Sequence, residues 1–416
     1  MFNKRILLTT ILIIMLFLCF TGSVFAADPI IYFTYLFNFN LSFAPCPVSS
    51  TNLLIEQGHI PLLDLFEKHN KWTTQFFFSG YTSDYLQENY PDVIKKVKRG
   101  VERGNYELGT YTLAHPILSL TPYNNLIRQL KKGLEIDKRV WGVNPKGLFL
   151  PENAWDVCLP DVMDEVGIEW ISLYKEIIPE YAEKLNYPAT VFIEGINDKK
   201  AKAVICSHYI DRGSLEDFKK KMDTLYGELK KEGIQECLIA LKNDGEVIYF
   251  QSMAMLNNDK GTSLKWGDKM PELPAIKAWD EKLTLIENLP YAKFITMSEY
   301  LKKHPPKGTL SDEDISLVAD FGKWLRGEGV ERLNILTNEA RIEVVSAEYV
   351  INLAEKMGMD VTESRKLLEE AWYQLMLSEG ADGRATLPHS SRKVFVADAA
   401  VRAIKLAKKA ADTIKK

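Results

Sequence analysis

Short apolar runs alternate with stretches of helical periodicity from residue 28 to about 304, and this alternation limits the possible folds more than any other feature of the sequence. The apolar runs predict strands, and the stretches between them predict amphipathic helices. Strand–helix alternation at this spacing is typical of parallel βα units, and about seven such units favour a barrel, complete or distorted. The predicted strands are 30–37, 73–78, 106–108, 147–150, 168–173, 203–207 and 238–241, and the predicted helices are 60–69, 92–103, 123–140, 159–166 and 215–232.

The character of the sequence changes after the segment 303–308, whose prolines and glycine are typical of a linker. Beyond it the pattern predicts only helices, over 311–325, 343–357, 362–377 and 393–414, with Ser311 and Thr362 as N-caps. We therefore expect an α/β barrel domain over 27–305, followed by a helical bundle domain over 306–416. The last helix is rich in Ala and Lys, and a solvated helix face explains its charge more simply than an acidic partner does.

The first 26 residues have the pattern of a cleaved secretion signal. Lys4 and Arg5 precede an almost unbroken apolar run, and Val24-Phe25-Ala26 is a small-x-small cleavage site. The run of about 15 residues is short for a bilayer span, although an uncleaved anchor remains the alternative. The sequence predicts a secreted or periplasmic protein with no stable membrane span after cleavage.

Composition narrows the class of partner. The chain has 52 basic and 56 acidic residues, so its net charge of −4 argues against nucleic acid as a main partner. No CxxC spacing occurs, and Cys206 and Cys237 lie in apolar runs. We expect these two cysteines to be buried small hydrophobic residues, although export would permit a disulfide. The oligomeric state stays open.

Active groups of parallel βα folds collect on the loops that follow the strands. The polar residues at such positions are Asn38 and Asn40 after the first predicted strand, His115 with Glu107 upstream, Glu152, the segment from His208 to Arg212, and Asp244 with Glu246 two residues later.

Glu152 and Asp244 are the strongest candidates for chemistry. Each follows an apolar run of β character and is flanked by loop-forming residues. A facing pair of carboxylates is the equipment for cleaving glycosides, in which one group attacks or activates water and the other protonates the leaving oxygen. Trp155 could stack on a sugar ring. The alternative is that both carboxylates are ordinary helix caps or turn residues.

Several motifs of other enzyme classes are absent from the sequence. None of the six histidines pairs with another at i+3 or i+4, and no HExxH occurs, so a lone His115 is more simply a hydrogen-bonded loop residue than a metal ligand. There is no Gly-x-Ser-x-Gly elbow, no GxGxxG after the first strand and no phosphate-binding loop. We expect no metal and no organic cofactor.

The stretch from about Glu56 to Tyr174 resembles glycoside hydrolase family 57. The motifs that carry the resemblance are ERGNYELGTYTLAHPIL, GLFLPENAW, GIEW and, much later, NDGE. The resemblance implies a distorted (β/α)7 barrel followed by a helical domain, and a retaining enzyme that acts on α-glucans without a metal cofactor. It also implies that Glu152 is the nucleophile and Asp244 the general acid/base, with Glu107, His115 and Trp155 lining the substrate cleft.

The first strand departs from the family pattern. The usual H-x-H-Q-P is replaced by residues 38–42, so Asn38 and Asn40 stand in place of both histidines. An asparagine can bind a sugar hydroxyl, but it does not titrate near neutrality as histidine does. An altered substrate is therefore expected, with three alternatives: a catalytically silent carbohydrate-binding relative, a partner-binding protein, or a polysaccharide deacetylase. The deacetylase pattern would need a second histidine where Tyr111 lies.

Overall fold

The computed structural model describes residues 28–174, 189–206, 213–311, 322–327, 329–385 and 388–415. The predicted secretion signal and the predicted site residue His208 lie outside these ranges.

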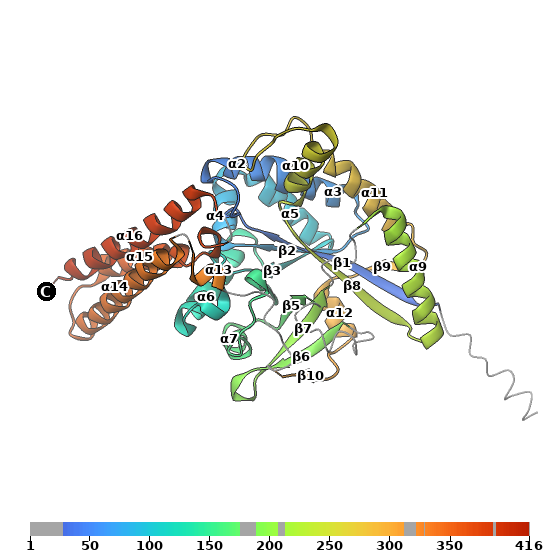
Figure 1. Cartoon of the computed structure of the whole chain (residues 1–416). Helices are drawn as coiled ribbons and strands as arrows, with labels where there is room; N and C mark the ends of the chain where they lie inside the picture. The colour runs from blue at the N-terminus through green and yellow to red at the C-terminus, as the bar shows by residue number, and fades with distance from the viewer. Residues whose placement is uncertain are drawn as a thin grey trace, which may run out of the picture.

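A curled, mostly parallel sheet forms the centre of the molecule (Figure 1). Its strands follow the order β10-β6-β7-β5-β4-β3-β2-β1-β8, and β9 pairs with β1 beside this path. Among the described strand pairs of the sheet, only β6 and β7 pair in antiparallel fashion. The strands are β1 (Ile30–Phe39), β2 (Thr74–Phe78), β3 (Tyr106–Thr110), β4 (Gly147–Phe149), β5 (Trp170–Tyr174), β6 (Thr190–Glu194), β7 (Lys200–Cys206), β8 (Glu236–Asp244), β9 (Ala292–Phe294) and β10 (Thr309–Leu310).

The seven strands predicted from apolar runs are all present, and the barrel is open and distorted. Strands β6, β9 and β10 were not predicted: β9 and β10 are only three and two residues long, too short to show a period. Thr309 and Leu310 pair with β6, so the sheet continues a few residues beyond the expected boundary at 305.

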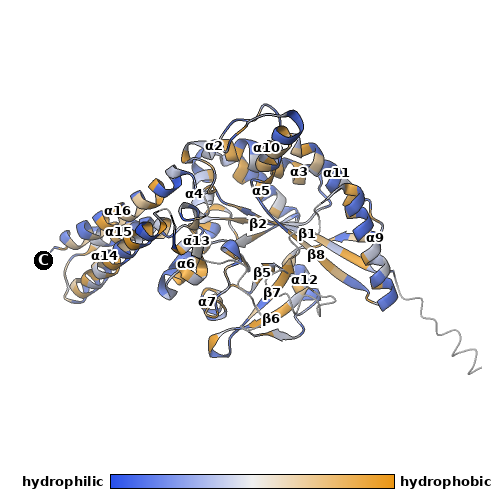
Figure 2. Ribbon diagram, viewed as in Figure 1, coloured by the Kyte–Doolittle hydropathy of each residue, from blue (hydrophilic) through white to orange (hydrophobic). Residues whose placement is uncertain are grey.

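Helices cover the outer face of the sheet, with apolar faces turned inward (Figure 2). Three of them, α6, α7 and α9, have the bounds expected from the sequence, and Ser214 forms the capping box that begins α9. The helices of the barrel region are α2 (Thr51–Leu54), α3 (Ile60–Lys68), α4 (Gly80–Asn89), α5 (Pro91–Glu102), α6 (Tyr123–Val140), α7 (Leu159–Val166), α9 (Leu215–Glu232), α10 (Val247–Lys260), α11 (Ala275–Glu287) and α12 (Met297–Lys303).

The inner face of the curl is filled by large side chains from many strands. Alternate residues of the strands form one buried cluster, which includes Phe77, Phe149 and Trp170. Helix α12 closes the lower end of this interior, because Met297 and Tyr300 belong to the same cluster. The polar residues that follow the strands therefore collect at the opposite, upper end.

The C-terminal helices pack together around their own apolar cluster and extend away from the barrel (Figure 1). They are α13 (Gly322–Leu325), α14 (Val330–Lys356), α15 (Thr362–Ser378) and α16 (Ser390–Asp412). Helix α14 begins thirteen residues before the predicted start at 343. The prediction that Thr362 caps α15 is wrong, because Thr362 is the first residue of the helix and Val361 holds the N-cap position. The backbone N–H of Thr362 donates to Asp360 Oδ1 at 3.0 Å. Among the described residues, no helix is both long and apolar enough to cross a membrane.

Candidate active site

Asn38 and Asp244 are brought together by the register of the sheet. Strands β1 and β8 are parallel neighbours, and Asn38 is the partner of Asp244 at their carboxyl ends. The Asn38 side chain hydrogen-bonds to the Asp244 carboxyl group. This contact between a first-strand residue and a carboxylate late in the sequence is a direct consequence of the parallel pairing of β1 with β8.

Glu152 and His115 come from loops that follow β4 and β3. His115 Nε2 lies 3.5 Å from Glu152 Oε1. His115, Glu152 and Asn153 all have positive φ, at 52°, 53° and 52°. Side chains other than glycine rarely adopt this conformation, and it costs of the order of 1 kcal/mol or more per residue. Three such residues at one place indicate that the fold holds these side chains in a required position.

The amide of Asn40 links His115 to the C-terminal region. Asn40 Nδ2 lies 2.8 Å from His115 Nδ1 and donates to Asp382 Oδ2 at 2.7 Å, while Asn40 Oδ1 accepts from the backbone N–H of Ser42. Because the amide nitrogen can only donate, neutral His115 accepts at Nδ1 and carries its proton on Nε2, toward Glu152. The Tyr111 hydroxyl also contacts His115 Nδ1.

Burial sets the protonation of these groups. Burial and the negative charges of Glu246 and Glu152 raise the pKa of Asp244 to about 7. Burial opposes the charged form of His115, yet the negative charges of Asp382, Glu152 and Asp244 outweigh it and raise the histidine's pKa. Glu246 is itself fully buried, and its Oε1 lies 2.7 Å from His59 Nε2.

Lys242 was missed in the sequence, because a lysine in an apolar run is usually read as a solvent-facing strand residue. It lies two residues before Asp244, so its side chain points to the same inner face. Its Nζ donates to Asn153 Oδ1 at 2.8 Å and lies 3.8 Å and 4.5 Å from the ring centres of Phe149 and Tyr174. Burial lowers the pKa of this amine to about 8.

Asp382 was also missed, because the sequence pattern placed it in a separate helical domain. It belongs to the short 3-10 turn η8 (Ala381–Gly383), and the backbone N–H of Ala381 donates to the His115 carbonyl at 2.9 Å. Burial raises the pKa of the Asp382 carboxyl group. The C-terminal region thus contributes a side chain to the barrel site.

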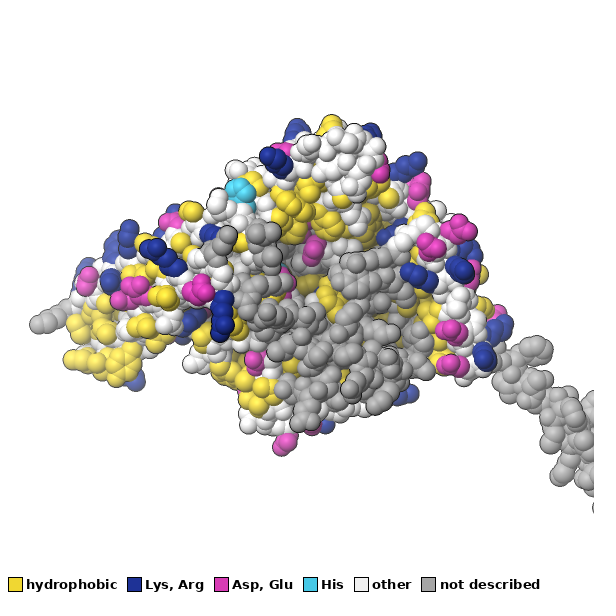
Figure 3. Space-filling view, viewed as in Figure 1, with side chains coloured by type: hydrophobic (Ala, Val, Ile, Leu, Met, Phe, Trp, Pro, Cys, Tyr) yellow, Lys and Arg dark blue, Asp and Glu magenta, His cyan; other side chains and the backbone are white. Residues whose placement is uncertain are grey.

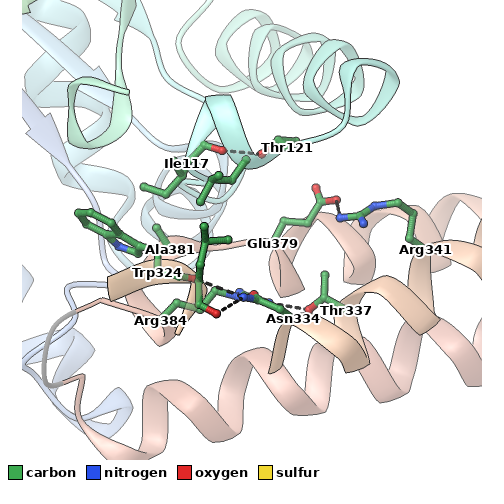
Figure 4. A pocket seen from close by; sticks show the side chains of 11 residues that line it. Ile117, Thr121, Trp324, Asn334, Thr337, Arg341, Glu379, Ala381 and Arg384 are labelled. Carbon is green, nitrogen blue, oxygen red and sulfur yellow. Dashed lines mark hydrogen bonds and ion pairs between the residues drawn. The ribbon is translucent and has the colours of Figure 1, made fainter. Parts of the chain in front are cut away.

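Buried Arg384 holds the turn that carries Asp382. Its guanidinium donates to the carbonyls of Ser378 and Gly380 and to the side chains of Asn334 and Thr337 (Figure 4). Arg384, Asn334 and Thr337 also line a small cavity of 190 Å³ between the helical region and the loop after β3. All the N–H directions of Arg384 are used within the protein, so this cavity offers a ligand little from its main charged group.

Two predicted cleft residues lie elsewhere. Glu107 is at the start of β3 and accepts hydrogen bonds from the backbone N–H and the hydroxyl of Ser298, the second residue of α12. Glu107 therefore lies at the lower end of the curl. The prediction placed it near the loop, but β3 runs three residues beyond it. Trp155 is 3% exposed and packs in the outer core with Leu150 and Leu159, so it offers no surface for stacking.

The described residues contain no group of three or more His, Cys, Asp or Glu side chains arranged to hold a metal ion. Cys206 and Cys237 are buried within apolar clusters, as their sequence context predicted.

Comparison with known sequences finds similarity to one family over part of the chain. Residues 48–197 match the sequence model of glycosyl hydrolase family 57. The chain is 31% identical over 129 residues to α-amylase 1 of Dictyoglomus thermophilum, a match covering 30% of this chain and 19% of that protein. It is 26% identical over 382 residues to the 4-α-glucanotransferase of Thermococcus litoralis, covering 82% of this chain and 52% of that one. The matches thus span about a fifth to a half of these curated relatives.

Comparison with solved structures agrees at the level of the fold. The α-amylase of Thermotoga maritima superposes with a TM-score of 0.65 at 12% identity, covering 92% of this chain and 93% of that one. A GH57 branching enzyme of Thermococcus kodakaraensis gives a TM-score of 0.62 at 13% identity, covering 91% and 89%. The fold is that of these glycan-active barrel proteins, a distorted (β/α)7 barrel with a helical C-terminal region. Over residues 48–197 the chain is similar to glycosyl hydrolase family 57.

Proposed function

We propose that this protein is a retaining glycoside hydrolase or transglycosidase, with Glu152 as the nucleophile and Asp244 as the general acid/base. The observation that carries the proposal is the contrast between the two carboxyl groups. The Glu152 side chain is 37% exposed and lies beside a histidine, whereas Asp244 is only partly exposed, and desolvation together with the neighbouring acids raises its pKa to about 7. Two carboxyl groups whose environments differ in this way can divide the roles of nucleophile and acid.

The chemistry follows from these positions. The Glu152 carboxylate attacks the anomeric carbon while the proton of Asp244 moves to the departing glycosidic oxygen, which gives a glycosyl-enzyme ester and a free hydroxyl on the leaving sugar. The Asp244 carboxylate then takes a proton from water or from an acceptor sugar, whose oxygen attacks the anomeric carbon and releases Glu152. The Nε2–H of His115 stabilises the carboxylate form of Glu152 between turnovers.

The substrate we propose is a polysaccharide or oligosaccharide, with an α-glucan as the first choice, since the matched relatives are named as α-amylases and 4-α-glucanotransferases. A groove of 560 Å³, lined in part by Asp244, Asn243, Phe250 and Gln251, provides space for sugar units on the acid side of the site. The apolar run at the N-terminus supports export, so the substrate would be a glycan outside the cytosol.

The test is a glycan screen with a reducing-sugar readout, made with wild type and Glu152→Gln. We expect the wild-type chain to cleave or rearrange at least one α-glucan, and the variant to lose on the order of 10³-fold or more in kcat, because the amide cannot form the ester intermediate. Glu165→Gln, at an exposed position on α7, is the matched control and should keep full activity. Turnover by Glu152→Gln at the wild-type rate would overturn the assignment.

A catalytically silent carbohydrate-binding relative is the second candidate, and Asn38 and Asn40 in place of the family's histidines favour it. The result that would identify a binding protein is saturable glycan binding, measured by calorimetry, with no product formed by the wild-type chain.

A further inference from the structure

Helix α14 carries a second apolar face that no described residue covers. The exposed large hydrophobic residues of this helix are Ile335, Ile342, Val345, Tyr349, Val350, Leu353 and Met357, and their exposed fractions run from 44% to 71%. Figure 3 shows hydrophobic side chains gathered along the lower edge of the C-terminal helices. A helix at the surface of a monomer ordinarily shows one apolar stripe, so a second one indicates an interaction surface.

This face lies opposite the one that holds α14 in the molecule. The inward face consists of residues such as Ala340, Val344 and Ile351, which pack on α15 and α16. At about 100° per residue, Ile342 and Tyr349 project from the other side of the helix. From Ile335 to Met357 the exposed stripe is about 33 Å long, the length of three heptads of a coiled coil.

Four of the seven stripe residues lie symmetrically about Ser346, an exposed small residue near the centre of the stripe. Ile335 and Met357 each lie eleven residues from Ser346, and Ile342 and Val350 each lie four residues from it. If a second copy of α14 packs antiparallel with the two-fold axis at Ser346, Ile335 meets Met357 of the other copy and Ile342 meets Val350. A surface that matches itself in this way is what a two-fold dimer needs.

Charge at the ends of the stripe fits the same arrangement. Arg332, in the first turn of α14, and Asp360, just beyond its last turn, each lie fourteen residues from Ser346, and both are exposed. Antiparallel pairing sets each arginine beside the other copy's aspartate at both ends. It also places the positive end of one helix dipole beside the negative end of the other.

We propose that the occupant of this face is a second copy of the chain, so that two molecules associate through antiparallel α14 helices. The barrels then lie at the far ends of the pair, and both candidate active sites stay open, since the stripe contains none of the site residues.

The first test is sedimentation velocity of the purified full chain at several micromolar concentrations. We expect a reversible dimer, whose dissociation constant rises on the order of 100-fold in Ile342→Glu, because the variant buries two charges in an apolar contact. Val394→Glu changes an equally exposed hydrophobic residue on α16, outside the stripe, and should leave the dimer unchanged. Circular dichroism checks that both variants fold.

Cross-linking tests the position of the axis. In Ser346→Cys the two introduced thiols face each other across the axis, so mild oxidation should give a covalent dimer far faster than in wild type or in Lys405→Cys, on α16. A wild-type chain that stays monomeric would overturn the proposal and favour a partner protein or a further segment of a longer chain. A dimer insensitive to Ile342→Glu, or no excess cross-linking at 346, would overturn it equally.

Discussion

Asp244 and Lys242 lie two residues apart on β8 and share one buried space, yet burial moves their pKa values in opposite directions. The acid is shifted up to about 7 and the amine down to about 8. Both shifts have the same cause, since a low-dielectric interior disfavours either charge. The site therefore has two groups that change protonation near neutral pH, where ordinary aspartate and lysine do not.

The pH dependence of turnover should report Asp244. A raised pKa means that the proton needed by the leaving group is present below about pH 7 and is lost above it, so kcat/KM should fall on the alkaline side with an apparent pKa near 7. In Asp244→Asn this limb should vanish, and the remaining activity should be confined to substrates with activated leaving groups. An unchanged alkaline limb in the variant would assign it to another group.

Lys242→Met should raise the stability of the protein and lower its activity. The depressed pKa means that the unfolded chain binds a proton that the folded chain releases between about pH 8 and 10, so wild-type stability rises with pH across that window. At pH 7 the methionine variant avoids the buried charge and should be more stable, by on the order of 1–3 kcal/mol. Its kcat should fall, because Asn153 loses its hydrogen bond and the turn that carries Glu152 relaxes. Denaturant unfolding and kinetics on the same preparation check both, and a variant with lower stability and full kcat would contradict this account.

The candidate site could be predicted only where a residue lies at the carboxyl end of a strand or in the loop beyond it. Asn38 and Asp244 lie at strand ends, and Asn40, His115 and Glu152 lie in the loops that follow. Lys242 could not be found, since a buried cation is unfavourable by sequence reasoning and is tolerated here because two rings and an amide surround it. Asp382 could not be found either, since only tertiary packing brings residue 382 to residue 40.

At the scale of elements, helix boundaries were predicted well where polar caps and apolar faces agree, as in α6, α7 and α9. Helix α10 was missed because Tyr249, Phe250 and Met253 spread its apolar residues around the axis. Helix α12 was missed although Thr296 and Glu299 form a capping box, because the helix is only seven residues long.

The packing of α6 on β3 depends on a buried acid. Asp137 accepts a hydrogen bond from the Thr110 hydroxyl at 2.7 Å, and burial raises its pKa well above the usual value. The folded protein therefore keeps a proton that the unfolded chain releases above about pH 4, and this contribution to stability declines as pH rises.

Asp137→Asn should keep the acceptor for Thr110 and remove that pH dependence. We expect the variant to match wild type near pH 4 and to melt a few degrees higher at pH 7, measured by thermal unfolding across this range. Asp92→Asn, at the exposed start of α5, is the control. A lower melting temperature at pH 7 would show that the folded protein holds Asp137 ionised.

At the scale of the whole molecule, the barrel and the C-terminal helices are joined by specific polar contacts as well as by the Asp382 turn. Buried Arg392, near the start of α16, donates to the Cys46 carbonyl at 2.9 Å, and the backbone N–H of Val48 donates to the Ser391 hydroxyl. The helical region is thus one wall of the site, and the two regions should lose their structure together.

Arg392→Ala should weaken the contact between the barrel and the C-terminal helices. Removing the guanidinium leaves the Cys46 carbonyl without its charged donor, which we expect to cost about 2–4 kcal/mol of the free energy of unfolding. Fluorescence and far-UV dichroism should still show coincident transitions at a lower denaturant midpoint, with kcat/KM reduced in proportion to the misplacement of Asp382. Two separate transitions in the wild-type chain would contradict a joined molecule.

Helix α12, which closes the lower end of the barrel interior, has a consequence for the reaction itself. Glu152 follows β4 and Asp244 ends β8, so the gap between their carboxyl groups is a width measured across the curl. Met297 and Tyr300 of α12 belong to the same buried cluster as Phe149 of β4 and Ala240 of β8, so their size contributes to the packing that separates these strands. If Glu152 and Asp244 act as proposed, a larger or smaller side chain at 297 or 300 should change the distance between the two carboxyl groups, and with it the choice between direct attack and attack through water.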